Sequence, residues 1–150
     1  MPRHDWTHII LHHSATADSS TYSWEAIKRY HTQTLHWTDI GYHYGIEQVG
    51  TDFASLLGRP IHKSGAHCKQ AGMNHKGIGL CFVGNYDTIP PSTKMLTQAA
   101  RTIIIPLMHQ YNIPLANIQP HSAYATYKSC PGMSFPLAHL KTIIGDNYNA

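Results

Sequence analysis

Residues 78–83 read IGLCFV, a short apolar run bounded by Gly77 and Gly84. Such a run between glycines is typical of a strand buried on both faces, as in a parallel sheet covered by helices. A second apolar strand is predicted at 6–12, which is too short for a helix and leads into a polar loop at 14–18. Alternating residues predict a third strand at 42–49, and Gly50 predicts a tight turn into a fourth strand near 52–57.

Three helices are predicted around these strands, at 24–34, 93–111 and 136–144. Ser23 and Ser92 stand where N-cap residues are preferred, and Tyr30 is expected on the core face of the first helix. Pro106 should kink or break the second helix because it lacks an N–H group, and Gly145 should end the third. The order strand, helix, strands, helix, helix indicates an α/β fold, a sheet covered by helices.

The length and composition fit one globular domain spanning residues 1–150. Hydrophobic residues make up 42% and charged residues 13%, which excludes a disordered polyelectrolyte or a coiled coil. No apolar run approaches the about 20 residues of a membrane helix, so membrane insertion is not expected. The net charge of +3 is dispersed, which argues against nucleic-acid binding. The N-terminus shows no hydrophobic signal core, which predicts a cytoplasmic protein.

Histidine and cysteine carry the clearest chemical signal. The chain has 13 His against 11 Lys plus Arg, and a surplus of imidazoles favours a metal or proton-transfer site. Its three cysteines include no C-x-x-C pair and are odd in number. A disulfide framework, a zinc ribbon and a thioredoxin-like redox motif are therefore not expected, and any cysteine with chemistry must act together with histidine.

Two segments could supply a metal site. His12 stands where the first predicted strand ends, and His121 and Cys130 share a polar loop between two prolines. Two imidazoles and a thiolate would leave one tetrahedral position open for water, as in a catalytic zinc site. A single His-x8-Cys pair in a loop also arises by chance, so the spacing alone leaves both readings open.

The sequence resembles the zinc-dependent N-acetylmuramoyl-L-alanine amidases of the amidase-2 and peptidoglycan-recognition superfamily, in particular their T7-phage-lysozyme type. Four blocks carry the resemblance in the family's order: HHSAT at 12–16, WTDIGYHY at 37–44, NHKGIGL at 74–80 and KSCP at 128–131. Together they cover most of the chain. The resemblance implies a single domain with a central mixed β-sheet flanked by helices and a zinc ion in a cleft on one side.

The resemblance also assigns roles to individual positions. It implies that His12, His121 and Cys130 bind one Zn²⁺ per chain, and that Tyr42 and Lys128 are catalytic. Zinc would polarise the scissile carbonyl and activate water, the lysine would stabilise the oxyanion, and the tyrosine would orient water or shuttle a proton.

Four further positions follow from the resemblance or from strand geometry. His67 corresponds to a cleft histidine near the muramyl-peptide substrate, and Trp37 is expected at the cleft wall. Cys81 occupies a strand position where some relatives carry a catalytic Glu, so the Tyr–Lys mechanism is expected here. His13 should point away from the cleft if its neighbour points into it, because successive strand residues face opposite sides.

The implied reaction is hydrolysis of the amide between N-acetylmuramic acid and L-alanine of the stem peptide. The expected partner is bacterial peptidoglycan, the expected state is a monomer, and the expected role is that of an endolysin that collects in the producing bacterium's cytoplasm and then reaches the wall. A cytoplasmic muropeptide-recycling amidase and a non-catalytic peptidoglycan-binding module are the alternatives. A muramidase would need two carboxylates that flank the glycosidic bond, and the sequence offers no convincing pair. A cysteine amidase would have to use Cys68 or Cys81 as its nucleophile.

Overall fold

The computed structural model describes residues 5–15 and 23–149. Its centre is a five-stranded mixed sheet in the order β3-β2-β4-β1-β5, which confirms the predicted fold class. The strands are β1 (His8–His13), β2 (Tyr44–Val49), β3 (Asp52–Leu57), β4 (Gly77–Phe82) and β5 (Ile118–Pro120). Neighbouring strands run parallel except β2 and β3, which form an antiparallel hairpin. The predicted loop at 14–18 lies largely outside the described residues.

The strand predicted from residues 78–83 is the middle of this sheet. All six residues of β4 are buried, and β4 lies between β2 and β1. Gly50 makes the β2–β3 turn at a φ of 65°, a conformation that glycine adopts without strain. β5 was not predicted, because three residues ending in Pro120 carry no alternation and proline is confined to edge strands.

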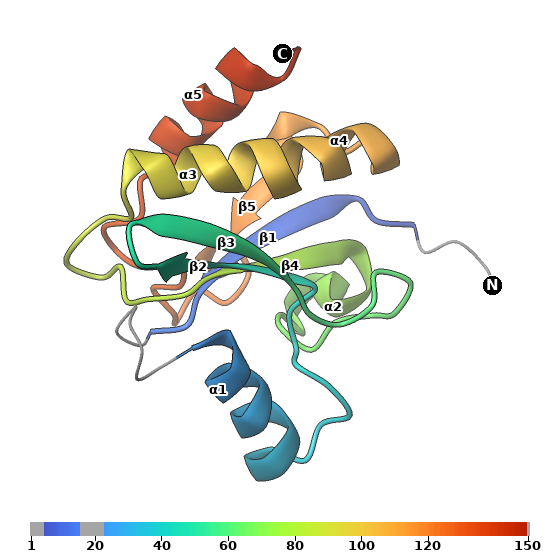
Figure 1. The fold of residues 1–150 in the computed structure, drawn as a ribbon. Coiled ribbons are helices and arrows are strands. Elements are labelled where there is room, and N and C mark those ends of the chain that lie inside the picture. Colours follow the sequence, from blue (N-terminus) through green and yellow to red (C-terminus); the bar gives the residue numbers. More distant parts are fainter. Residues whose placement is uncertain (1–4, 16–22, 150) are drawn as a thin grey trace.

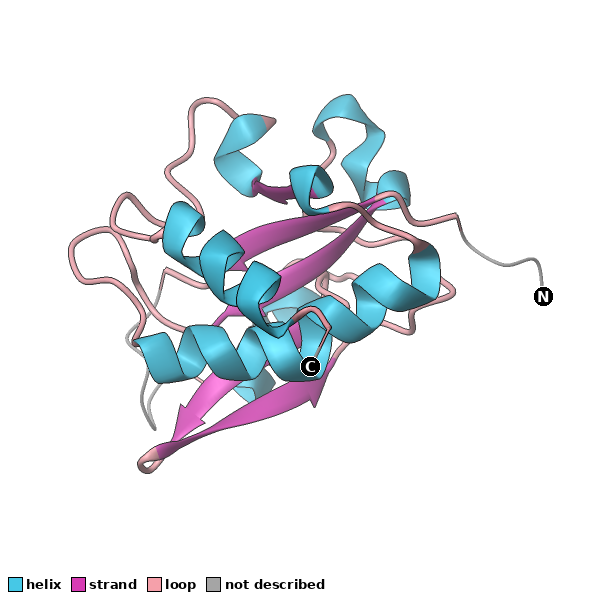
Figure 2. Cartoon of the chain, turned by 90° about the horizontal axis from the view of Figure 1, so that it is seen from above, coloured by secondary structure: helices cyan, strands magenta, loops and turns pink. Residues whose placement is uncertain are grey.

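Helices cover both faces of the sheet (Figures 1 and 2). Above it in Figure 1 lie α3 (Thr93–Ala99), a π-helical segment (Ala100–Ile104), α4 (Ile105–Tyr111) and α5 (Leu137–Asn147). Below it lie α1 (Trp24–Arg29), a π-helical segment (Tyr30–Thr34) and the short α2 (Met73–Lys76). Short 3-10 turns occur at Gln70–Gly72, Leu115–Asn117 and His121–Ala123.

Two predicted helix starts are confirmed. The Ser23 hydroxyl accepts the Ala26 N–H at 3.3 Å, and the Ser92 hydroxyl accepts the Met95 N–H at 3.2 Å. Each bond satisfies one of the N–H groups that a helix N-terminus leaves without a partner. Pro106 does not break its helix. The chain stays helical from α3 through α4, and the disturbance takes the form of the widened π-helical turn that precedes the proline.

Two helix predictions are wrong. α5 continues through Gly145 to Asn147, whose side chain donates to the Ile143 carbonyl at 2.7 Å and accepts from Arg101 Nε at 2.9 Å, so the last turn is held from two sides. Tyr30 is 54% exposed instead of packing in the core. Six residues at 3.6 per turn place it about 120° around the helix from buried Trp24.

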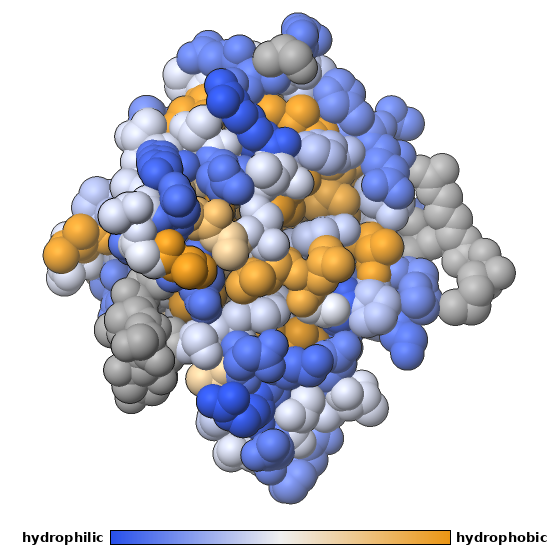
Figure 3. All heavy atoms as spheres, viewed as in Figure 1, coloured by the Kyte–Doolittle hydropathy of each residue, from blue (hydrophilic) through white to orange (hydrophobic). Residues whose placement is uncertain are grey.

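The main core lies between the sheet and the layer formed by α3, α4 and α5, and includes Ile9, Leu80, Phe82, Leu96 and Ile104. On the opposite face of the sheet, the described residues form two smaller apolar clusters, around Trp24 and around Met73. No helix among the described residues is long and apolar enough to cross a membrane. Figure 3 shows polar residues over the α1 end of the molecule, with apolar residues surfacing mainly across its middle.

Candidate metal centre

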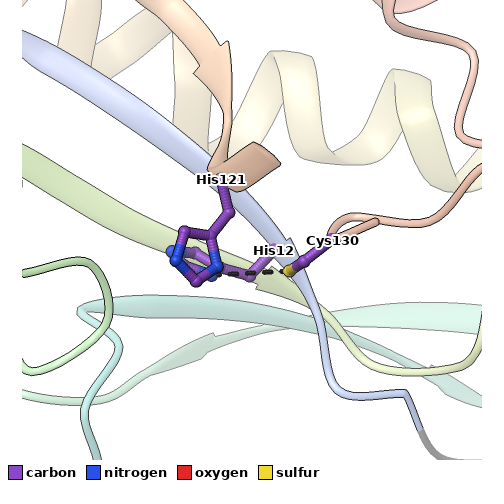
Figure 4. A group of neighbouring side chains, drawn as sticks. All are labelled: His12, His121 and Cys130. Carbon is purple, nitrogen blue, oxygen red and sulfur yellow. Dashed lines mark hydrogen bonds between the residues drawn. The ribbon is translucent and has the colours of Figure 1, made fainter. Parts of the chain in front are cut away.

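Three predicted ligands converge at the carboxyl ends of neighbouring strands (Figure 4). β1 and β5 are parallel and pair as far as Leu11 and Pro120, so the next residues, His12 and His121, emerge at the same edge of the sheet. Cys130 returns to this edge from the following loop. One ligand atom from each of the three side chains lies within 4.8 Å of the others, and Sγ of Cys130 lies 3.6 Å from Nδ1 of His12.

The protonation states of the two imidazoles suit metal binding. Burial lowers the pKa of His12 well below its usual range, with nearby His67, His121 and Lys128 adding to the effect. Burial, followed by Lys128, lowers the pKa of His121 to about 4. Both rings are therefore neutral near pH 7, which is the form that binds metal ions.

The thiol needs a cation to become a ligand. Burial raises the pKa of Cys130 to about 11, although a hydrogen bond from the protein and the charge of Lys128 oppose this. The backbone N–H of His13 points at its sulfur at 3.3 Å, a contact that favours the thiolate. A bound divalent ion would deprotonate the thiol outright, because its charge dominates the local field.

His13 points away from the three candidate ligands, which decides between two neighbouring histidines that the sequence alone could not tell apart. Its Nδ1 accepts the backbone N–H of Tyr86 at 3.1 Å, on the side of β1 that faces the main core. It thereby fixes the loop that follows β4 and takes no part in the metal-binding group.

The two residues expected to be catalytic border the ligands. Tyr42 lies just before β2, with its ring centroid 5.1 Å from that of His12, and its hydroxyl is hydrogen-bonded to Cys81. Burial, followed by Cys81 and Cys130, raises the pKa of Tyr42 well above its usual range, so the phenol keeps its proton. Lys128 is exposed at the mouth of the cleft.

One cleft of about 540 Å³ contains every site residue predicted from the sequence. Its lining includes His12, Trp37, Tyr42, His67, His121, Lys128 and Cys130. Trp37 is 37% exposed and packs on His31 with ring centroids 4.6 Å apart. The structure thus brings together residues that are up to 118 positions apart in the sequence.

Three residues of this cleft, His31, Asp87 and Tyr127, were not predicted from the sequence. His31 accepts the Gly41 N–H at 3.0 Å and so fixes the turn before Tyr42. Its only sequence signal was a place on the buried face of the first helix. Asp87 accepts a hydrogen bond from the Ser129 hydroxyl at 2.8 Å and thereby holds the loop that carries Cys130. Tyr127 is 74% exposed at the cleft mouth. Neither of the last two carried a sequence signal.

Comparison with known proteins finds similar endolysins, amidases and peptidoglycan-recognition proteins. The chain is 33% identical over 127 residues to the endolysin of Escherichia phage T7, covering 82% of this chain and 78% of that protein. The amidase LysC of Clostridium intestinale superposes with a TM-score of 0.77 at 26% identity, over 94% of this chain and 86% of LysC. A variant of Drosophila PGRP-LB solved with tracheal cytotoxin superposes with a TM-score of 0.71 at 26% identity, over 89% and 79% of the two chains.

The sequence profile of one enzyme family matches residues 2–133, which is most of the chain. That family is described as N-acetylmuramoyl-L-alanine amidase, and the amidase LysC shares the fold described above. The chain therefore belongs to the N-acetylmuramoyl-L-alanine amidase family, and it is a peptidoglycan amidase.

Proposed function

We propose that this amidase hydrolyses the bond between N-acetylmuramic acid and L-alanine with the help of one zinc ion held by His12, His121 and Cys130. The observation that carries the proposal is the convergence of these three side chains at one end of the cleft. Two imidazoles and one thiol are donors that zinc accepts, and three protein ligands are the number found in catalytic zinc sites.

The spacing of the donor atoms fits zinc. Bonds of about 2.0–2.1 Å to nitrogen and about 2.3 Å to sulfur at a tetrahedral angle place the two atoms about 3.6 Å apart. Sγ of Cys130 and Nδ1 of His12 lie at that separation. When bound, zinc would supply a Lewis acid that polarises the scissile carbonyl and lowers the pKa of its bound water to about 7.

The chain's own residues supply the remaining chemistry. The Lys128 ammonium lies at the cleft mouth close enough to His12 and His121 to lower the pKa of both, so its charge is available to an oxyanion formed in front of them. Tyr42 keeps its proton beside His12 and can donate a hydrogen bond, or pass a proton to the leaving nitrogen.

The cleft suits an extended, partly anionic peptide. A second hollow of about 320 Å³ shares Trp37, His67 and Lys128 with the first and adds Lys69, so that two lysines line the combined groove. The exposed indole of Trp37 provides an apolar wall. A relative of the same fold was solved with tracheal cytotoxin, which supports a peptidoglycan fragment as the occupant of this groove.

The cellular role that we propose is that of an endolysin, monomeric and accumulating in the cytoplasm of the producing bacterium before it reaches the wall. The similarity to a phage endolysin over 82% of the chain supports this role over muropeptide recycling. A complete ligand set with Tyr42 and Lys128 supports catalysis over binding alone. A cysteine mechanism is disfavoured because Cys68 and Cys81 are buried and burial raises the pKa of both thiols.

Metal analysis combined with a wall-lysis assay tests the proposal. The purified protein should contain close to one zinc per chain, clear a suspension of cell walls, release new L-alanine N-termini, and lose the activity in EDTA until zinc is restored. Lysis that survives complete metal removal would overturn the zinc mechanism, and release of reducing sugar ends instead of amino termini would indicate a muramidase.

A further inference from the structure

His67 is hydrogen-bonded through both ring nitrogens, and one of these bonds ends on a proposed metal ligand. Its Nε2 lies 2.8 Å from the Gly77 carbonyl oxygen, and its Nδ1 lies 2.9 Å from Nε2 of His12. A carbonyl oxygen can only accept, so Nε2 of His67 carries the hydrogen. In a neutral imidazole that donates through one nitrogen, the other nitrogen is an acceptor, so Nδ1 of His67 carries the lone pair.

This arrangement determines which nitrogen of His12 is free. Because Nδ1 of His67 is an acceptor, Nε2 of His12 must donate its N–H to it. The lone pair of His12 is then on Nδ1, which is the nitrogen that lies 3.6 Å from Sγ of Cys130. The chain of bonds therefore runs from the Gly77 carbonyl through two imidazoles to the atom that would bind the metal.

The surrounding backbone holds His67 in this orientation. A Cβ atom at Gly79 would come within 2.7 Å of Cδ2 of His67, and one at Gly65 within 2.4 Å of the same atom. The His67 backbone N–H is held by Oδ1 of Asn74 at 2.7 Å. Glycine normally weakens a strand, so Gly79 in the middle of β4 has a specific use here: it leaves the slot in which the imidazole ring lies.

We infer that His67 is a positioning residue of the metal centre, which holds the His12 ring in the orientation and tautomer that present Nδ1 to the metal. The inference rests on the proposed zinc site. The role goes beyond the one expected for His67 beside the substrate. Because both ring nitrogens are hydrogen-bonded within the protein, the ring offers only carbon atoms to the cleft. Outer-shell partners of this kind orient a ligand imidazole and increase its basicity.

Two amide substitutions separate the two hydrogen bonds of His67. In His67→Asn, Oδ1 takes the place of Nδ1 and can still accept from His12. In His67→Gln, the amide reaches the place of Nε2 and the Gly77 carbonyl, and the acceptor beside His12 is lost. We expect His67→Gln to weaken zinc binding about 10- to 100-fold, whereas His67→Asn keeps most of the affinity.

The control is His43→Asn. The His43 ring packs against His67 with centroids 5.8 Å apart, and its Nδ1 accepts the Gly79 N–H at 3.1 Å. The asparagine oxygen can keep that bond. The other ring nitrogen of His43, Nε2, lies 2.8 Å from the Lys63 carbonyl oxygen, so both of these hydrogen bonds join the ring to the backbone. This variant should bind zinc as the unmodified protein does, even if its melting temperature falls.

Zinc dissociation constants are measured on the metal-free proteins by competition with a chromophoric chelator, after circular dichroism has shown that each is folded. The visible spectrum of the cobalt-loaded proteins provides a second measurement, and it should change in His67→Gln but not in His43→Asn. Equal zinc affinity and equal spectra for His67→Gln and the unmodified protein would overturn the inference, as would an equal loss in His67→Asn. If the unmodified protein binds no zinc, the proposed metal centre itself has failed.

Discussion

The two faces of the central sheet are built from alternate residues of the same strands and have opposite compositions. On the face covered by α3, α4 and α5, β1 and β4 present Ile9, Leu11 and Phe82 together with other large apolar side chains, all fully buried. On the other face the same strands present His12, Cys81 and two glycines, Gly77 and Gly79, beside a smaller apolar cluster around Trp24.

The residues that stabilise the fold and the residues proposed to carry the chemistry therefore lie on opposite faces of the same sheet. Burial of large apolar side chains supplies most of the favourable free energy of folding, and it is concentrated on one face. Small residues on the other face leave space for imidazole rings, whose N–H groups and lone pairs are then fixed by backbone partners. If this division is real, substitutions on one face should affect stability alone, and substitutions on the other should affect metal binding and turnover.

The largest effect is expected at the metal ligands. Cys130→Ser replaces a thiolate by a hydroxyl that zinc binds poorly, so it should abolish both metal content and wall lysis. This loss exceeds the about 100-fold loss of metal affinity that is the upper range for residues bonded to a ligand. Elemental analysis and turbidity clearing measure the two losses. Cys68→Ser, a second buried cysteine that lies outside the ligand set, is the matched control and should keep its zinc.

The opposite face is tested by Phe82→Ala. Phe82 is fully buried and packs edge-on against Phe135 with ring centroids 5.0 Å apart. Truncation should lower the free energy of unfolding by about 3–5 kcal/mol, as measured by denaturant titration. The zinc affinity of the folded fraction should stay unchanged, and Phe82→Leu should recover most of the stability. A parallel loss of zinc affinity in folded Phe82→Ala would show that the two faces are coupled.

A smaller effect is expected from the charge at the cleft mouth. Lys128→Ala should keep its zinc and its melting temperature but lower kcat by about 100- to 1000-fold, the loss typical for removing one oxyanion stabiliser. Lys128→Arg, which keeps the charge, should retain more activity than Lys128→Met, which keeps only the length. If all three variants were as active as the unmodified protein, Lys128 would have no part in the mechanism.

The comparison of faces also explains how far the sequence could predict the molecule. Strands β1 to β4 and the two capped helices follow local rules, namely apolar runs, alternation and serine caps, and these were predicted. The cleft residues depend on contacts between distant segments, and their predicted roles rested on resemblance to a family. Spacing alone could not unite Cys130 with His12, because strand order and the β1–β5 register bring them together.

What the sequence could not supply is the set of partners of each imidazole. Nothing local indicates that His67 donates to Gly77, or that Asp87 holds the loop that carries Cys130. The end of α5 was also beyond local rules, because Gly145 is a common helix stop and is overridden here by the contacts of Asn147. Tertiary contacts outweigh local preference at such positions.

The smallest effect is expected from a histidine that serves structure on the cleft face. Nδ1 of His31 accepts the buried N–H of Gly41, which requires a neutral ring, and burial followed by the charge of Arg59 lowers the pKa of His31. In the unfolded chain, His31 binds a proton below its usual pKa of about 6.5, whereas in the native state the ring stays neutral to a lower pH. The contribution of this hydrogen bond to the free energy of unfolding is therefore lost as the pH falls.

His31→Asn isolates this contribution. The asparagine oxygen can take the place of Nδ1 and does not titrate. Between pH 7.5 and 5.5 the free energy of unfolding of the variant should therefore fall by about 1 kcal/mol less than that of the unmodified protein. This difference lies within the about 1.4 kcal/mol that one proton contributes per pH unit. Denaturant titrations across this range measure the difference, and the other histidines contribute equally to both proteins. Parallel curves would mean that His31 takes up its proton in the native state, and that the histidines of this face are less firmly fixed than their hydrogen bonds indicate.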